Sequence, residues 1–178
     1  LPDIYQQLQV ASTLVETREK QALDVADSGV DDDVFFDKFL VIVSEFDTLH
    51  QDLKDWEIDQ GIIKKSDKPT HIKFIETIAK RGHALNVQIG LDGQSPSVGA
   101  SGISEALRDQ FAIMLLGDSC ANSAVVSKFG SGNSVDLKSQ ADTLLKNELR
   151  PAIIQLGSGE PEVYCVPYMP EIREVKFS

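Results

Sequence analysis

The sequence predicts an α/β fold, in which a mainly parallel sheet carries helices on both faces and ends in an antiparallel hairpin. Three short runs rich in Val, Ile, Leu and Phe, at residues 39–43, 85–91 and 111–116, have the length of buried strands. Segments with helical spacing lie between them, and alternation of strands with helices is typical of a parallel sheet. We therefore expect these three strands to lie side by side.

The expected helices come from apolar residues that recur at helical spacing. Residues 4–26 predict one long amphipathic helix that starts near Pro2 and Asp3, and residues 47–60 suit a short helix. Residues 71–82 predict a helix with Thr70 as its cap and Gly82 at its end. Later helices are expected at residues 104–109, 119–129 and 135–147, and the hairpin strands at residues 152–156 and 162–166 around the turn sequence GSGEP.

Length and composition suit one soluble globular domain over residues 1–178. The hydrophobic fraction of 42% is enough for a sizeable core, and no apolar run approaches the roughly 20 residues of a membrane span. The two cysteines, Cys120 and Cys165, form no metal-binding pair, and we expect reduced thiols in a cytoplasmic protein. Because the first residue is Leu1 rather than Met, the sequence is also consistent with a piece of a larger protein.

Acidic residues concentrate in the first third of the chain. The net charge is −11, and residues 1–59 hold 15 acidic and 4 basic side chains, whereas acidic and basic residues balance in the remainder. This charge argues against a general nucleic-acid-binding surface, which needs Lys and Arg for phosphate contacts. DNA contact is left to a few loops, with Lys64, Lys65, Lys68 and residues 97–102 as the candidates, although isolated features of this kind are more often plain solvated loops.

Polar residues follow two of the predicted strands at their carboxyl ends, where ligands bind in open α/β sheets. Ser44 and Glu45 end the run FLVIVSE, and Gln94 comes just past the second strand. A carboxylate here can orient an attacking water, and a serine hydroxyl can contact a metal-bound water without adding charge. A glutamine can contact a γ-phosphate. The competing interpretations are a buried strand without a catalytic acid and a loop-stabilising amide.

Two further sequence patterns limit the possible function. The sequence Gly-Asp-Ser at Ser119 is typical of some hydrolases, but Ala121 breaks the nucleophile-elbow pattern and nothing indicates a histidine base. The phosphate-loop pattern G-x-x-x-x-G-K-[ST] is missing from the sequence. Without that loop the β- and γ-phosphates of a nucleotide have no anchor. We therefore expect this chain by itself to bind ATP poorly or not at all.

Taken together, these segments resemble the C-terminal part of the RecA-like motor of FtsK/SpoIIIE-type (HerA/FtsK) DNA translocases. The segment LVETREK resembles the helix with an E-x-x-R-type motif that precedes the family's Walker B strand, and FLVIVSEFDTL resembles that strand. The segment IETIAKRGHALNVQIGLDGQSPSV is similar to the helix and strand that end in its sensor motif. GISEALRDQFAIMLLG and PAIIQLGSGEPEVYCVPYMPE resemble the following helix and strand and the closing hairpin.

The resemblance implies a partial RecA-like P-loop ATPase core and a role for each candidate residue. Glu45 corresponds to the Walker B catalytic glutamate, Gln94 to the phosphate sensor, and Arg108 to an arginine that acts at a neighbouring subunit's ATP site. Ser44 stands where the family has the Mg²⁺-supporting aspartate, and Gly93 where it often has Thr. The intact motor would use ATP and Mg²⁺ and act as a homo-oligomeric ring, such as a hexamer, on double-stranded DNA in DNA segregation or plasmid conjugation.

The missing phosphate loop, and the departures from the family pattern at Ser44 and Gly93, leave two hypotheses open. In the first, the half that carries the phosphate loop lies outside this sequence, and the chain is the remaining part of an ATP-dependent translocase. In the second, the chain is a degenerate, non-catalytic RecA-like module that serves as an interaction or scaffold domain, with the acidic helix at residues 4–26 as its binding face. A phosphate loop upstream of Leu1 in the parent reading frame would favour the first hypothesis.

Overall fold

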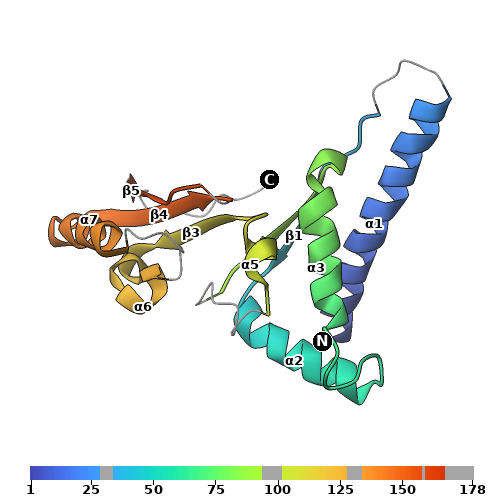
Figure 1. Ribbon diagram of the computed structural model, residues 1–178, viewed down its shortest axis with the longest axis horizontal. Helices are drawn as coiled ribbons and strands as arrows, with labels where there is room; N and C mark the ends of the chain where they lie inside the picture. The colour runs from blue at the N-terminus through green and yellow to red at the C-terminus, as the bar shows by residue number, and fades with distance from the viewer. Residues whose placement is uncertain (29–33, 94–101, 128–133, 158, 167–178) are drawn as a thin grey trace, which may run out of the picture. The chain divides into compact units, whose positions relative to one another are not determined.

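The computed structural model of the 178-residue chain describes residues 1–28, 34–93, 102–127, 134–157 and 159–166. It consists of two compact units, unit 1 over residues 1–110 and unit 2 over residues 111–178. Each unit combines helices with a small sheet, which confirms the predicted α/β class (Figure 1). Among the described residues, no helix has both the length and the apolar composition needed to cross a membrane.

The described residues of unit 1 form mainly three helices and two strands, and most of their positions agree with the sequence periodicity. The elements are α1 (Pro2–Asp27), β1 (Phe39–Val43), α2 (Phe46–Asp59), α3 (Thr70–Arg81), the 3-10 turn η1 (His83–Leu85), β2 (Val87–Leu91) and the short α5 (Glu105–Arg108). Gly82 follows α3 as predicted, and a Cβ added there would lie 2.3 Å from the Val87 carbonyl oxygen, so only glycine fits this turn.

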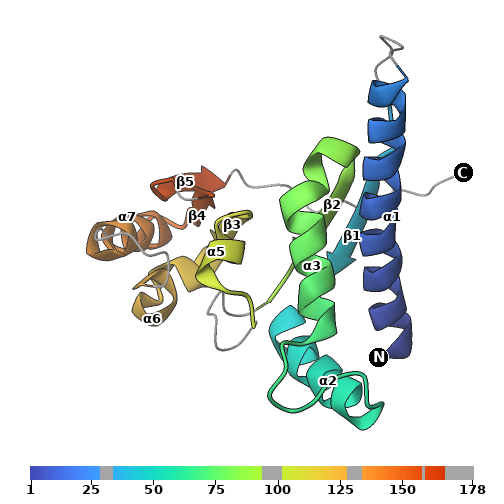
Figure 2. The ribbon, with the colours of Figure 1, turned by 45° about the vertical axis from the view of Figure 1, so that its right-hand side comes forward.

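The two strands of unit 1 run parallel, with Phe39 opposite Val87 and Val43 opposite Leu91. Helices α1 and α3 lie side by side against one face of this pair (Figure 2). The core between them is apolar and contains Ala11, Val15, Ile78, Leu85 and Val87, with Phe36, Phe39, Val41 and Ile89 packed around it. Alternate residues of β1 face this core, as the period of two in a strand requires.

The prediction of helices on both faces of the parallel strands is wrong for the described part of unit 1. On the face opposite α1 and α3, the side chains of Leu40 and Ile42 are 53% and 67% exposed. Parallel strands are normally covered on both faces because their crossover helices lie there. The continuous apolar run of β1 therefore predicts more cover than unit 1 supplies.

Unit 2 contains β3 (Ala112–Leu116), the 3-10 turn η2 (Gly117–Ala121), α6 (Ser123–Val126), α7 (Ser134–Lys146), β4 (Arg150–Leu156) and β5 (Glu162–Val166). Its strands are ordered β3-β4-β5 and all pairs are antiparallel. The predicted C-terminal hairpin is confirmed as the β4–β5 pair. The single helix predicted over residues 119–129 is instead η2 followed by α6 within the described residues.

The predicted position of the third strand is wrong, and with it the prediction of a mainly parallel sheet. β3 does not extend the β1–β2 pair but pairs antiparallel with β4, with Met114 opposite Ile154. Its side chains alternate, so that Leu115 is buried while Met114 and Leu116 are more than half exposed. Such alternation is typical of an antiparallel sheet covered on one face, but it is invisible in a run whose residues are all apolar.

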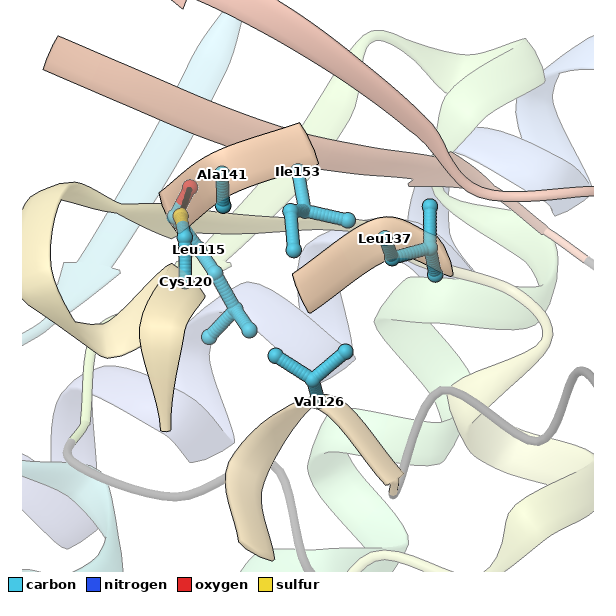
Figure 3. Packing of buried hydrophobic residues seen from close by; sticks show 6 residues of the cluster. All are labelled: Leu115, Cys120, Val126, Leu137, Ala141 and Ile153. Atoms are coloured by element: carbon cyan, nitrogen blue, oxygen red, sulfur yellow. Dashed lines mark hydrogen bonds between the residues drawn. The ribbon is translucent and has the colours of Figure 1, made fainter. Parts of the chain in front are cut away.

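The buried core cluster of unit 2 is formed by residues of β3, η2, α6, α7 and β4. Leu115, Cys120, Val126, Leu137, Ala141 and Ile153 point toward one another between the sheet and the helices (Figure 3). Cys120 is fully buried, and its thiol donates to the carbonyl oxygen of Leu115 at 3.4 Å. Burial raises the pKa of this thiol, so Cys120 acts as a small core residue.

Candidate functional site

The carboxyl ends of β1 and β2 lie next to each other, because the two strands are parallel and in register. The amide of Asp92 donates to the Val43 carbonyl oxygen at 2.9 Å, and the amide of Phe46 donates to the Asp92 carbonyl oxygen at 2.7 Å. These bonds hold the Ser44–Glu45 segment beside Asp92 and Gly93. Gln94, the predicted phosphate sensor, follows Gly93 directly but lies outside the described residues.

Glu45 occupies a left-handed backbone conformation, with φ 53° and ψ 40°, between β1 and the first turn of α2. This region costs a residue with a side chain about 1–2 kcal/mol. The carbonyl oxygen of Glu45 accepts the amide of Leu49 at 3.0 Å, so the residue also starts the helix. Its side chain is exposed at the strand end, where an ionised carboxylate can meet water and ligands.

Asp47 is a second carboxylate at this edge, and the sequence analysis missed it. It lies in the first turn of α2 and is half-buried against the β2 end, where a Cβ added to Gly93 would come within 2.9 Å of its Oδ1 atom. Gly93 therefore allows the backbone after β2 to pass close to this carboxylate. The polar pattern EFD directly after the strand was the available signal.

The hydroxyl of Ser44 and the carboxylates of Glu45 and Asp47 are oxygen ligands of the kind that suits hydrated Mg²⁺. Ser44 is exposed and adds no charge. Among the described residues, no three His, Cys, Asp or Glu side chains gather closely enough to hold a metal ion. Arg108, the predicted trans-acting arginine, is half-buried at the end of α5, which packs against α3.

Two of the predicted DNA-contacting lysines take part in local interactions within the described residues. Lys68 forms an ion pair with Glu76, and Asp67 accepts the backbone amide of Lys64 at 2.9 Å. The proposed DNA-contacting residues 97–101 lie outside the described residues. Ser119, the candidate hydrolase serine, is an exposed residue of η2.

A buried chain of three titratable side chains joins α2 to α3, and the sequence analysis did not predict it. Nδ1 of His50 lies 2.8 Å from Nε2 of His71, and Nδ1 of His71 lies 2.9 Å from Oε1 of Glu57. Glu57 and His71 have no exposed surface, and His50 is 8% exposed. Titratable groups gathered in the interior need a specific partner each, because burial penalises an unpaired charge.

Glu57 also serves as the N-terminal cap of α3, although it belongs to α2. Its Oε2 atom accepts the amide of Thr70 at 2.7 Å, and its Oε1 atom accepts the amide of His71 at 2.8 Å. These are two of the free amides at the start of a helix, and a negative charge there is favourable. Thr70 is therefore the first residue of α3 and not its cap. The residue before α3, Pro69, makes no side-chain cap bond.

The buried environment of the Glu57–His71–His50 chain of side chains keeps both histidines neutral. Burial is the main cause that lowers the pKa of His50, to about 4, and the neighbouring His71 and Lys54 lower it further. Burial also lowers the pKa of His71, against the opposing effect of its bond to Glu57. On α1, Tyr5 packs against Trp56 and Phe74 at the same helix junction, and burial followed by the nearby Glu57 charge raises its pKa.

The sequence of α2 contains a pattern that could have indicated the buried Glu57–His71–His50 chain. Its buried residues are Phe46, His50, Leu53 and Glu57, which recur at helical spacing along one face. Two polar residues therefore occupy positions that the periodicity assigns to the core. Their partner, His71, is on another helix, and only the packing of α2 against α3 identifies it.

Comparison with models of known protein families gives no match for this chain. Neither the curated proteins nor the solved structures show a match to it. The function is therefore inferred from the residues and the geometry of the β1–β2 edge.

Proposed function

We propose that this chain is part of an ATP-dependent double-stranded DNA translocase of the FtsK/SpoIIIE type, in which the β1–β2 edge contributes to the ATP site. The observation that supports this proposal is the parallel, in-register β1–β2 pair. It brings Ser44 and Glu45 beside the segment that leads into Gln94. Two polar loops at one carboxyl edge are the arrangement in which open α/β sheets bind ligands.

In this function Glu45 orients the water that attacks the γ-phosphate, and Asp47 adds a second negative charge on the metal side of the site. The left-handed backbone at Glu45 directs the residue out of the strand while α2 begins at once behind it. Backbone strain of this kind is common at functional positions. Phosphate binding would come from a separate half that carries the phosphate loop, and Arg108 would serve a neighbouring subunit of a ring.

The exposed face of β1 is consistent with a missing half. Leu40 and Ile42 would be covered in a complete parallel sheet, and β1 and β2 pair only with each other within the described residues. A larger core around the same edge would cover the exposed side chains of Leu40 and Ile42 and would provide further strands beside β1 and β2.

The first experiment compares DNA-stimulated ATP turnover of the intact parent protein with that of its Glu45→Gln variant. Loss of a water-orienting carboxylate should lower turnover at least about 100-fold. Glu148→Gln is the matched control, because Glu148 is also an exposed glutamate with a left-handed backbone, at φ 58°, but lies in unit 2. Turnover that survives Glu45→Gln would refute the proposed role.

The alternative is a non-catalytic interaction or scaffold module, which the uncharged Ser44 at the aspartate position favours. The parent reading frame upstream of Leu1 separates the two functions, since a phosphate loop there favours the motor. ATP and Mg²⁺ binding by the isolated chain provides a second check. We expect little or none, and micromolar binding would contradict the requirement for a second half.

A further inference from the structure

The buried Glu57–His71–His50 chain has no role in the proposed ATP site, yet its hydrogen bonds assign a definite proton to each position. The two oxygens of Glu57 face three N–H groups, two from the backbone of α3 and one from the His71 ring. An ionised carboxylate only accepts, so His71 carries its proton on Nδ1. Its Nε2 is then an acceptor, and His50 donates to it from its own Nδ1.

The remaining edge of the His50 ring, with Nε2 and Cε1, faces the backbone at Gly102. A Cβ added to Gly102 would lie 2.3 Å from each of these two atoms, so the absence of a side chain gives the ring its place. The His50 and His71 rings meet at an angle of 60° with their centroids 5.0 Å apart. Only one proton fits between the two rings at a nitrogen separation of 2.8 Å.

We propose that the Glu57–His71–His50 chain is a proton-sensitive latch between α2 and α3, closed while both rings are neutral and opened when the pair takes up one more proton. An added proton on His71 Nε2 would make that ring a buried cation that donates to His50 Nδ1, and the His50 proton would then sit on Nε2, at the edge that faces Gly102. One added on His50 Nε2 would leave a buried cation. In either case the pair gains a charge that Glu57, already engaged by three donors, can balance only in part.

Other charged and titratable groups around the pair do not remove this penalty. From α2, the charge of Lys54 disfavours a positive charge on His50, whereas the charge of Glu57 favours it. From α1, Tyr5 is held in its neutral form next to Glu57. From α3, His71 faces His50 as its hydrogen-bond partner. The balance of burial and charge favours the closed, neutral latch, in agreement with the lowered pKa of both rings.

The direction of the pH effect follows from this balance. The histidines of the unfolded chain take up protons near pH 6.5, whereas His50 in the folded chain resists down to about pH 4. The contribution of the neutral histidine pair to the free energy of unfolding is therefore fully present above pH 6.5. It is lost as the pH falls from 6.5 toward 4. Since α2 begins directly after Glu45, opening the latch would also release the helix that positions the edge of the β1–β2 sheet.

Nuclear magnetic resonance of the ¹⁵N-labelled full chain tests the latch at the level of protons. We expect both rings in the Nδ1–H form at neutral pH, with a titration midpoint of His50 well below 6.5. An Nε2–H form for His71, or a His50 midpoint near 6.5, would overturn the proposal. This measurement needs no mutation and is independent of ATP binding, so its outcome does not depend on the proposed function.

Unfolding in urea from pH 7.5 to 4.5 tests the expected loss of stability at acid pH. For each histidine kept neutral by folding, the unfolding equilibrium constant should rise by about tenfold per pH unit below 6.5. His50→Gln should reduce this slope by about one proton, and His83→Gln, which removes an exposed histidine that is not part of the Glu57–His71–His50 chain, is the matched control. An unchanged slope in His50→Gln would refute the latch.

Discussion

Replacing Glu57 by Ala tests the inferred link between α2 and α3 most directly. The substitution removes the acceptor of two α3 backbone amides and of the His71 ring N–H, at 2.7, 2.8 and 2.9 Å. A buried donor left without a partner costs about 1–3 kcal/mol, and the amide of His71 and its ring N–H, both fully buried, lose their acceptor in Glu57→Ala. Because water can reach the half-buried Thr70 amide, we expect a loss of about 3–4 kcal/mol in the free energy of unfolding.

Glu57→Gln is the conservative comparison. It keeps the size of the side chain and one oxygen acceptor, but its amide group presents N–H donors where the carboxylate accepted. We expect a loss of about 2 kcal/mol, between those of the wild type and Glu57→Ala. Asp52→Ala removes an exposed carboxylate of the same helix and should change stability by less than about 0.5 kcal/mol.

Urea unfolding followed by the fluorescence of Trp56 is the suitable assay, since this is the single tryptophan of the chain and lies next to Glu57 on α2. Its signal reports on unit 1, where the mutation acts. A loss below about 1 kcal/mol for Glu57→Ala would refute the interpretation of Glu57 as the cap of α3 and the partner of His71. Equal losses for Glu57→Gln and Glu57→Ala would show that the charge itself carries the whole effect.

Two further predictions concern the packing of each unit. Gly102→Ala should destabilise unit 1 by more than Gly61→Ala, because both have a positive φ but only at Gly102 would the added Cβ meet the His50 ring. Backbone strain alone accounts for about 1–2 kcal/mol at either site, and equal losses by Trp56 fluorescence would contradict the contact. Ile153→Ala, at a fully buried position of β4, should cost about 2–5 kcal/mol, measured by amide hydrogen exchange in unit 2. Leu156→Ala, which is 69% exposed on the same strand, should be nearly neutral, and similar losses at both positions would refute the assignment of the core.

The sequence alone determined the local structure of this protein to a large extent. Helical spacing predicted α1 and α3 within one or two residues, and short branched aliphatic runs predicted β1 and β2. Turn residues between two strand-like runs predicted the β4–β5 hairpin. These features depend on neighbours in the chain, so the period of apolar residues and the preferences of Gly and Pro are enough to define them.

Only the tertiary structure decided which elements meet. β3 pairs with β4 in a separate sheet, because an entirely apolar run does not reveal which alternate side chains will be covered. The cap of α3 is Glu57 from another helix, and His50 acquires its partner on α3. Polar residues on a buried helix face are tolerated only if a distant segment satisfies them. Local periodicity carries no information about that segment, whereas the packing of α2 against α3 defines it.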